Sequence, residues 1–184
     1  AYVELSECID FDEKLTMKEV SERYFGYMKL RNRTNQVESV VLKAMAESER
    51  FKDSIVYNVI LKRDNDTQFA AICVALPDKS IYIAFRGTDD AIAGWKEDFA
   101  LSFKETNAQA YAVSYLSKSI RRKRTVYRVG GHSKGGNLAL YATLKLPEEK
   151  QNVIRNIYVN DSPGICPEML DLEKYNNIKN KKGE

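Results

Sequence analysis

The stretch from Val126 to Leu140 limits the possible folds of this chain most strongly, because it joins a strand pattern to a helix pattern through a glycine-rich turn. Within that turn lies the pattern G-x-S-x-G, formed by Gly131, Ser133 and Gly135. A serine at such an abrupt turn is held in a strained backbone conformation that exposes its hydroxyl, and its neighbours at two residues' distance must be small. The N-terminus of the following helix directs backbone N–H groups toward the serine, which favours negative charge there.

Two other glycine motifs do not fit this turn. A phosphate-binding loop requires Lys and Ser/Thr after its last glycine, where this chain has Gly136 and Asn137. A dinucleotide-binding fingerprint requires glycine where Ser133 stands. Two interpretations remain: a serine nucleophile on a sharp turn, and a glycine-rich turn with an incidental serine. The β-rich run before the turn, and the small residues Ala139 and Ala142 after it, favour the nucleophile.

Length and charge exclude several classes of protein. A chain of 184 residues favours one domain, 1–184, with a helical flank over about 1–50. The net charge of +3 requires no nucleic-acid partner, and the basic run 121–124 falls where a helix should end, so cations there favour the helix dipole. The longest apolar run, 69–76, is too short to span a bilayer, and no signal-peptide pattern opens the chain.

The cysteines indicate the compartment. Cys8, Cys73 and Cys166 are widely spaced and odd in number, which argues against a disulfide framework and against a metal site. This usage fits a reducing cytoplasm, so we expect a cytoplasmic protein without a metal or an organic cofactor.

The first third of the chain predicts helices. The run Thr16 to Glu19 has the pattern of a capping box, and four apolar residues follow at helical spacing: Met17, Val20, Tyr24 and Met28. A second helix is predicted from Asn35, with Glu38 three residues on. Its apolar stripe would comprise Val37, Val40, Val41, Ala44 and Met45.

The remaining patterns predict a mixed α/β sheet. Short polar turns join the strands predicted at 54–62, 69–76 and 80–85, which indicates antiparallel hairpins. Helices are predicted over 91–103 and 108–121. A strand at 125–130, a helix at 134–146 and a strand at 153–160 then alternate, and this alternation predicts a parallel section with right-handed crossovers.

A second candidate feature follows the predicted strand Ile81–Phe85. If this strand lies beside the one that precedes Ser133, Thr88 would lie at the carboxyl edge of the sheet, where ligands bind in open α/β folds. The backbone N–H of Thr88 and that of Lys134 would then form an oxyanion hole. The alternative is an ordinary turn after a strand, and the residues leave both interpretations open.

Three motifs in this order, Phe85-Arg86-Gly87-Thr88, Trp95-x-x-Asp98-Phe99 and Gly131-His132-Ser133-Lys134-Gly135-Gly136, together resemble the α/β-hydrolase superfamily. More narrowly, they resemble class 3 (fungal-type) lipases and a bacterial lipase-like family with a GHSKGG turn. The resemblance runs from about residue 81 to 164. It implies Ser133 as nucleophile and Thr88 and the Lys134 amide as oxyanion donors. It also implies structural support from Arg86, Gly87, Trp95, Asp98, Gly131, His132 and Gly135. Lipases of this type commonly have an apolar residue where Lys134 stands, so the charge of Lys134 argues against an apolar interfacial substrate.

A serine nucleophile needs a base, usually a histidine oriented by a carboxylate. The sequence has one histidine, His132, whose side chain should point away from the Ser133 hydroxyl, so we expect the base outside this sequence. Asp161 follows a predicted strand and is a candidate acid; the alternative is that it caps the Asp-Ser-Pro-Gly turn. Class 3 lipases place their acid after the next strand. From Pro167 the chain is polar and non-periodic, and we expect it to lack the final strand and histidine loop of this architecture.

These observations predict an α/β-hydrolase-like mixed sheet, antiparallel early and parallel late, flanked by helices. The predicted function is a serine hydrolase of the lipase or esterase type that cleaves an ester, acyl-lipid or thioester bond through an acyl-enzyme on Ser133. Its partner would be a small acyl or ester substrate. We expect no nucleic-acid partner and no integral membrane segment. The alternative is a catalytically inactive binding or scaffold protein of the same fold.

Overall fold

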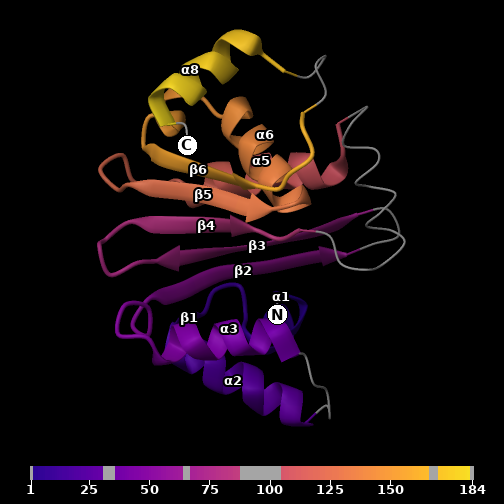
Figure 1. Cartoon of the computed structure of the whole chain (residues 1–184), viewed down its shortest axis with the longest axis vertical. Coiled ribbons are helices and arrows are strands. Elements are labelled where there is room, and N and C mark those ends of the chain that lie inside the picture. The colour runs from indigo at the N-terminus through magenta and orange to yellow at the C-terminus, as the bar shows by residue number, and fades with distance from the viewer. Residues whose placement is uncertain (1, 31–35, 64–66, 88–104, 166–169, 183–184) are drawn as a thin grey trace.

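A computed structural model describes residues 2–30, 36–63, 67–87, 105–165 and 170–182 (Figure 1). Its centre is a six-stranded sheet in the order β1-β2-β3-β4-β5-β6. The strands are β1 (Lys14–Thr16), β2 (Ile55–Arg63), β3 (Gln68–Ala75), β4 (Ile81–Phe85), β5 (Tyr127–His132) and β6 (Ile154–Asn160). Pairing is antiparallel from β1 to β4 and parallel from β4 to β6. The prediction of a mixed sheet, antiparallel early and parallel late, is therefore confirmed.

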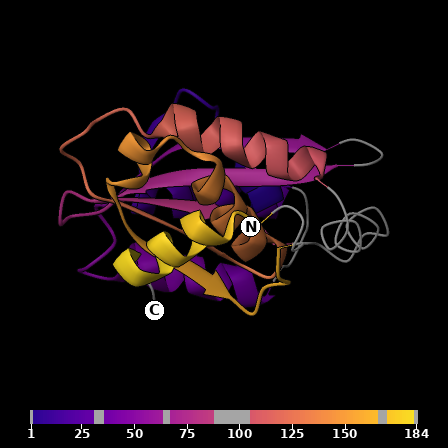
Figure 2. The ribbon, with the colours of Figure 1, turned by 90° about the horizontal axis from the view of Figure 1, so that it is seen from above.

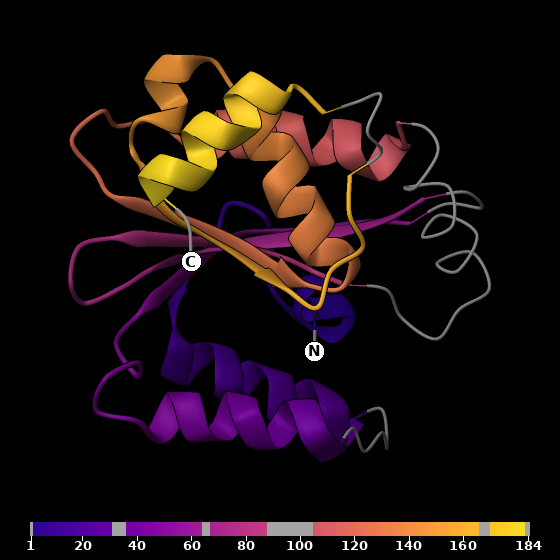
Figure 3. The same cartoon turned by 45° about the horizontal axis from the view of Figure 1, so that its top comes forward.

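Helices cover both faces of this sheet. They are α1 (Tyr2–Cys8), α2 (Met17–Leu30), α3 (Gln36–Glu47), α5 (Asn107–Ser119), α6 (Lys134–Lys145), α7 (Glu148–Gln151) and α8 (Leu172–Lys182). Figure 3 shows α2 and α3 on one face and α5, α6 and α8 on the other, and Figure 2 shows α6 between α5 and α8. Each face has its own apolar core, because strand residues alternate between the two faces.

Helix α2 begins with the capping box that the sequence predicts. The Glu19 N–H donates to Thr16 Oγ1 at 3.2 Å, and the Thr16 N–H donates to the Glu19 carboxylate at 2.7 Å. The four apolar residues predicted at helical spacing, Met17, Val20, Tyr24 and Met28, are all buried. Local signals therefore define both the start and the buried face of this helix.

The capping box makes the stability of α2 depend on pH. Hydrogen bonds from the backbone and side chain of Thr16 hold the pKa of Glu19 below its ordinary value of 4.5. A carboxylate whose pKa is lowered by folding contributes its full stabilisation of the folded state above roughly pH 5.5. That stabilisation is lost as the pH falls through 4.5 toward the pKa of the folded state. We therefore expect the melting temperature of Glu19→Gln to fall less than that of the wild type between pH 6 and pH 3.

Glu22→Gln is the matched control, since Glu22 is exposed on the same helix. Its acid sensitivity should follow the wild type. Equal acid sensitivity of Glu19→Gln and the wild type would contradict the contribution of the capping box.

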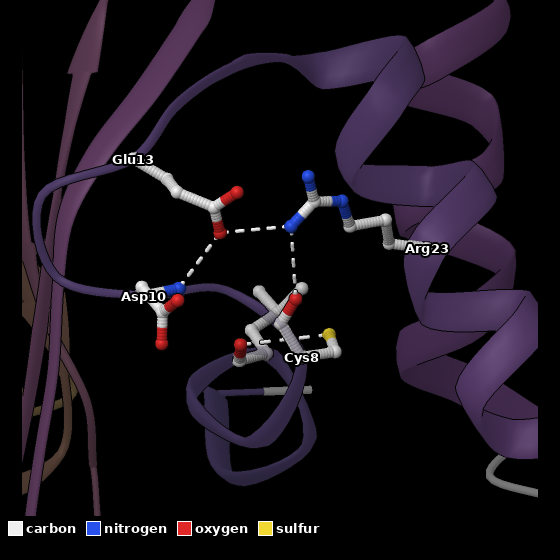
Figure 4. A network of polar contacts seen from close by, with 5 residues as sticks. Cys8, Asp10, Glu13 and Arg23 are labelled. Carbon is white, nitrogen blue, oxygen red and sulfur yellow. Dashed lines mark hydrogen bonds and ion pairs between the residues drawn. The ribbon is translucent and has the colours of Figure 1, made fainter.

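A polar network fastens α1 and the loop after it to α2 (Figure 4). Arg23 Nη1 donates to the Glu13 carboxylate at 2.8 Å and to the Cys8 carbonyl at 3.3 Å, and the Asp10 N–H donates to the same carboxylate at 2.9 Å. The Asp10 amide and the Arg23 guanidinium lower the pKa of Glu13. Burial raises the pKa of the Cys8 thiol, which keeps it protonated at neutral pH.

The predicted apolar stripe of α3 is wrong at three of its five residues, whereas Met45 is half-buried and packs against the core, and the side chain of Val37 lies outside the described part of the chain. Val40 and Val41 are 66% and 56% exposed and Ala44 is also exposed, whereas Leu42 and Ala46 are buried. Both sets of residues recur at helical spacing, so periodicity alone does not decide which one faces inward. Packing against α2 selects the smaller set. The predicted helix start at Asn35 lies outside the described residues.

Four of the described elements escape the sequence patterns: α1, β1, α7 and α8. The segment after Pro167, expected to be non-periodic, forms α8, which is highly polar and buries Ile178 against the core while Tyr175 packs beside it. One buried and one half-buried anchor on a polar helix are too weak a signal to predict it. The helix predicted over 91–103 lies outside the described residues.

Candidate active site

The ends of three parallel strands define the edge of the sheet where the candidate residues lie. Phe85 in β4 pairs with Gly131 in β5, and His132 in β5 pairs with Asn160 in β6. The chain then turns directly from β5 into α6 at Ser133. The carboxyl ends of β4, β5 and β6 therefore converge around this serine, as ligand sites do in open α/β sheets.

Ser133 has the strained backbone that its motif predicts. Its φ of 53° and ψ of −128° lie in a region that non-glycine residues rarely adopt, at a cost of about 1–3 kcal/mol. The Ser133 N–H donates to the Asn160 carbonyl at 2.9 Å, which links the turn to β6. Although Ser133 is the N-cap of α6, its side chain makes no capping hydrogen bond. The hydroxyl is thus not used to stabilise the helix.

Close backbone contacts explain the two glycines of the motif. A Cβ on Gly131 would lie 2.6 Å from the Phe85 carbonyl oxygen, and one on Gly135 would overlap that same carbonyl. Real Cβ contacts are essentially never this short, so the strand and the helix approach one another too closely for any side chain. The predicted need for small residues on both sides of Ser133 is confirmed.

The backbone strain at Ser133 can be measured by substitution. Ser133→Gly removes the steric cost of the positive φ, whereas Ser133→Ala keeps it, so we expect the glycine variant to be more stable by roughly 1 kcal/mol. Glycine is also favoured over alanine at an ordinary N-cap, so the relief of strain at the positive φ should add to that preference. Urea unfolding of the two variants measures the difference. A more stable alanine variant would show that Ser133 is not strained in solution.

The turn after β4 lies directly against the serine. A Cβ on Gly87 would be 2.8 Å from the His132 carbonyl oxygen and 3.6 Å from the Ser133 Cβ. The Arg86 N–H donates to the Ala70 carbonyl at 3.0 Å, so β4 still pairs with β3 at this point. The predicted site residues Thr88, Trp95 and Asp98 lie outside the described residues.

The Lys134 side chain points into the protein. It is 1% exposed, and Nζ donates to the Gln68 carbonyl at 2.9 Å, while its backbone begins α6 directly after Ser133. The sequence-based argument against an apolar substrate assumed that this charge lies at the site surface. That assumption is wrong, because the ammonium is buried below the turn.

His132 and Asp161 lie side by side at the same edge. The distance from His132 Nε2 to Asp161 Oδ2 is 3.9 Å, and the two side chains are 70% and 95% exposed. Such an exposed pair contributes at most about 1 kcal/mol and requires a protonated imidazole. Asp161 follows β6 directly, with a φ of 43°. Within the described part of the chain, no hydrogen bond joins the imidazole to the Ser133 hydroxyl.

A buried polar network below the turn was not predicted from the sequence. Gln109 Nε2 in α5 donates to Asn137 Oδ1 in α6 at 3.0 Å, and Asn137 Nδ2 donates to the Gly164 carbonyl at 2.9 Å. Both side chains are at most 1% exposed. Gln109 also completes a capping box with Thr106, a sequence signal that marks the start of α5 but gives no hint of the contact with Asn137.

No metal centre is found among the residues that the structure describes, since none of their His, Cys, Asp and Glu side chains form a group of three suitable for an ion. The helices in the described ranges include none that is both long and apolar enough to cross a membrane.

A strained serine between a parallel strand and a helix, in a mixed sheet covered on both faces, defines an α/β-hydrolase-like fold. The structure is similar to that of a fungal lipase solved as an inhibitor complex and described as a model for interfacial activation in lipases. The TM-score is 0.51 at 18% identity, over 79% of this chain and 62% of the lipase. The chain thus spans less than two thirds of that structure.

The chain belongs to the Mbeg1-like family, whose model matches residues 45–184. This match contains the sheet from β2 onward and the whole candidate site, and leaves α1, β1 and α2 outside it. A comparison with curated proteins gave no match.

Proposed function

We propose that this protein is a serine hydrolase that cleaves an ester, acyl-lipid or thioester bond through an acyl-enzyme on Ser133. The observation that supports this most directly is the positive φ of Ser133. Glycine would adopt this conformation without strain, yet the chain has a serine whose hydroxyl makes no capping bond. Strain of this kind concentrates at functional sites.

The proposed reaction uses the groups at this edge in sequence. Ser133 Oγ attacks the acyl carbon while a histidine takes its proton, and the backbone N–H groups of Lys134 and Thr88 bind the oxyanion that forms. The alcohol or thiol leaves with that proton, and water then releases the acyl group by the same steps. Since His132 pairs with Asp161 instead of the serine, the base in this proposal is a histidine outside the sequence.

Asp161 is the carboxylate that we propose to orient that histidine. It follows β6 directly, and its carboxylate lies beside His132, the residue before Ser133. Its exposure leaves it accessible to a histidine supplied by another segment. Asparagine in place of the acid of a catalytic triad typically keeps the geometry of the site but stabilises the wrong tautomer of the catalytic histidine.

Two further observations support the substrate class and the compartment. Burial of the Lys134 ammonium removes its charge from the site surface, which is compatible with an acyl chain, and the fungal lipase shares the fold. Cys8 and Cys73 are both free, which supports a reducing compartment such as the cytoplasm.

The alternative function is a non-catalytic binding or scaffold protein of the same fold. It is favoured by one observation: the single histidine of the sequence contacts Asp161 and makes no hydrogen bond to the Ser133 hydroxyl. In that case the strained turn would be kept by the close backbone packing around it.

Labelling of the full-length protein with a fluorophosphonate distinguishes the two functions. We expect one adduct, mapped to Ser133 by peptide mass spectrometry, and its complete loss in Ser133→Ala. Ser162→Ala is the control, because Ser162 lies against the first turn of α6 but has no role in the proposed reaction, and it should label normally. A folded wild type without an adduct, or labelling that survives Ser133→Ala, would reject the hydrolase.

A further inference from the structure

Lys134 is an unusual residue to find at its position. A cation at the N-terminus of a helix opposes the helix dipole, and an ammonium removed from water costs several kcal/mol unless hydrogen bonds replace its hydration. Yet Lys134 is the first residue of α6 and is 1% exposed. Sequences break such rules mainly at functional sites, so the contacts of this side chain indicate what it does.

The side chain connects two elements that are not neighbours. Its Nζ donates at 2.9 Å to the carbonyl of Gln68, the first residue of β3, while its backbone begins the helix above β5. In the sheet, β4 lies between β3 and β5. The lysine therefore reaches across the end of β4.

The end of β4 is enclosed by this arrangement. A Cβ on Gly135 would lie 3.0 Å from the Arg86 carbonyl carbon, so α6 packs directly on that end. On the other side, the Arg86 N–H donates to the Ala70 carbonyl of β3.

We propose that Lys134 is a positioning residue whose ammonium ties the start of α6 to the start of β3 and thereby holds the end of β4 against the nucleophile. In the reaction, this tether sets the distances between Ser133, the backbone N–H of Lys134 and Gly87. The role in catalysis rests on the proposed hydrolase function. The tether itself does not, and it can be measured separately.

The catalytic part is tested by the kinetics of fluorophosphonate labelling. We expect Lys134→Met, which fills the same space without the ammonium, to lower the maximal labelling rate by roughly 10- to 100-fold while the concentration for half-maximal rate stays unchanged. Lys134→Arg, which keeps a cationic donor, should recover most of the rate. Thr143→Val is the control, because Thr143 is a buried polar residue of the same helix, bonded to the Ala139 carbonyl, and it should label at the wild-type rate.

The tether itself is tested in the same proteins by NMR, without an activity measurement. The wild type should show a protected Lys134 Nζ signal by NMR at neutral pH, which requires no variant to fold. The Arg86 amide should exchange its hydrogen about 10-fold or more faster in Lys134→Met than in the wild type or Thr143→Val.

An unprotected Nζ, or an unchanged Arg86 amide, would overturn the tether. Wild-type labelling rates in Lys134→Met would overturn its role in positioning. An unlabelled wild type would instead reject the hydrolase function, and the NMR measurements would still decide the tether.

Discussion

Gly135→Ala is expected to destabilise the protein by on the order of 3 kcal/mol or more, since the new Cβ would overlap the Phe85 carbonyl and come within 3.0 Å of the Arg86 carbonyl carbon. Both obstacles are backbone atoms, at the last residue of β4 and the residue after it, so no side chain can rotate away, and α6 must move off the sheet. This result is opposite to the usual effect of Gly→Ala in a helix, which stabilises by roughly 1 kcal/mol. Urea unfolding followed by circular dichroism measures it.

Gly26→Ala is the matched control. Gly26 also lies within a helix, α2, but a Cβ there would meet nothing within 4 Å. We expect this variant to be more stable than the wild type by roughly 0.5–1 kcal/mol, because alanine restricts the unfolded chain. The two variants should thus change stability in opposite directions. A Gly135→Ala protein as stable as Gly26→Ala would show that α6 and β4 are further apart than the structure has them.

Asn137→Ala is expected to have the second largest effect, a loss of about 3 kcal/mol. The substitution removes the bond to the Gly164 carbonyl and leaves the Gln109 amide, which is fully buried, without its acceptor. Each buried polar group left unsatisfied costs about 1–3 kcal/mol. Because Asn137 holds the loop after β6, the amide hydrogens of Ser162 and Gly164 should also exchange faster.

Asn152→Ala serves as the control, since Asn152 is exposed and should change stability by at most roughly 0.5 kcal/mol. The double variant with Gln109→Leu adds a sharper test. Because Gln109 then no longer needs an acceptor, the combined loss should be smaller than the two single losses together. Strictly additive losses would contradict the bond between Gln109 and Asn137.

The parts of the fold that the sequence predicts well depend on neighbouring residues. The turn at Ser133, its flanking glycines and the capping box at Thr16 each arise from steric or hydrogen-bonding rules that act over four or five residues. The antiparallel strands follow from short polar turns between adjacent strand-forming runs, for the same reason. These features therefore depend little on residues elsewhere in the chain.

The features that the sequence does not predict require a partner from a distant segment. Periodicity offers α3 two apolar faces, and contact with α2 selects the one containing Leu42. Helix α8 is polar along most of its length, and its contact with the core gives Ile178 a place to be buried. In both cases the hydrophobic contribution depends on which surface lies opposite, and no local pattern contains that information.

The candidate site divides in the same way. The residues around Ser133 are enough to predict the strained turn, because the bulk of Cβ atoms restricts φ, ψ and the approach of strand to helix within a few residues. The positions of the charges, in contrast, depend on contacts between distant segments of the folded chain. It buries the Lys134 ammonium against Gln68, 66 residues away, and places Asp161 beside His132. A long charged side chain can reach either water or a buried carbonyl, and the choice depends on the acceptor that folding brings within its reach.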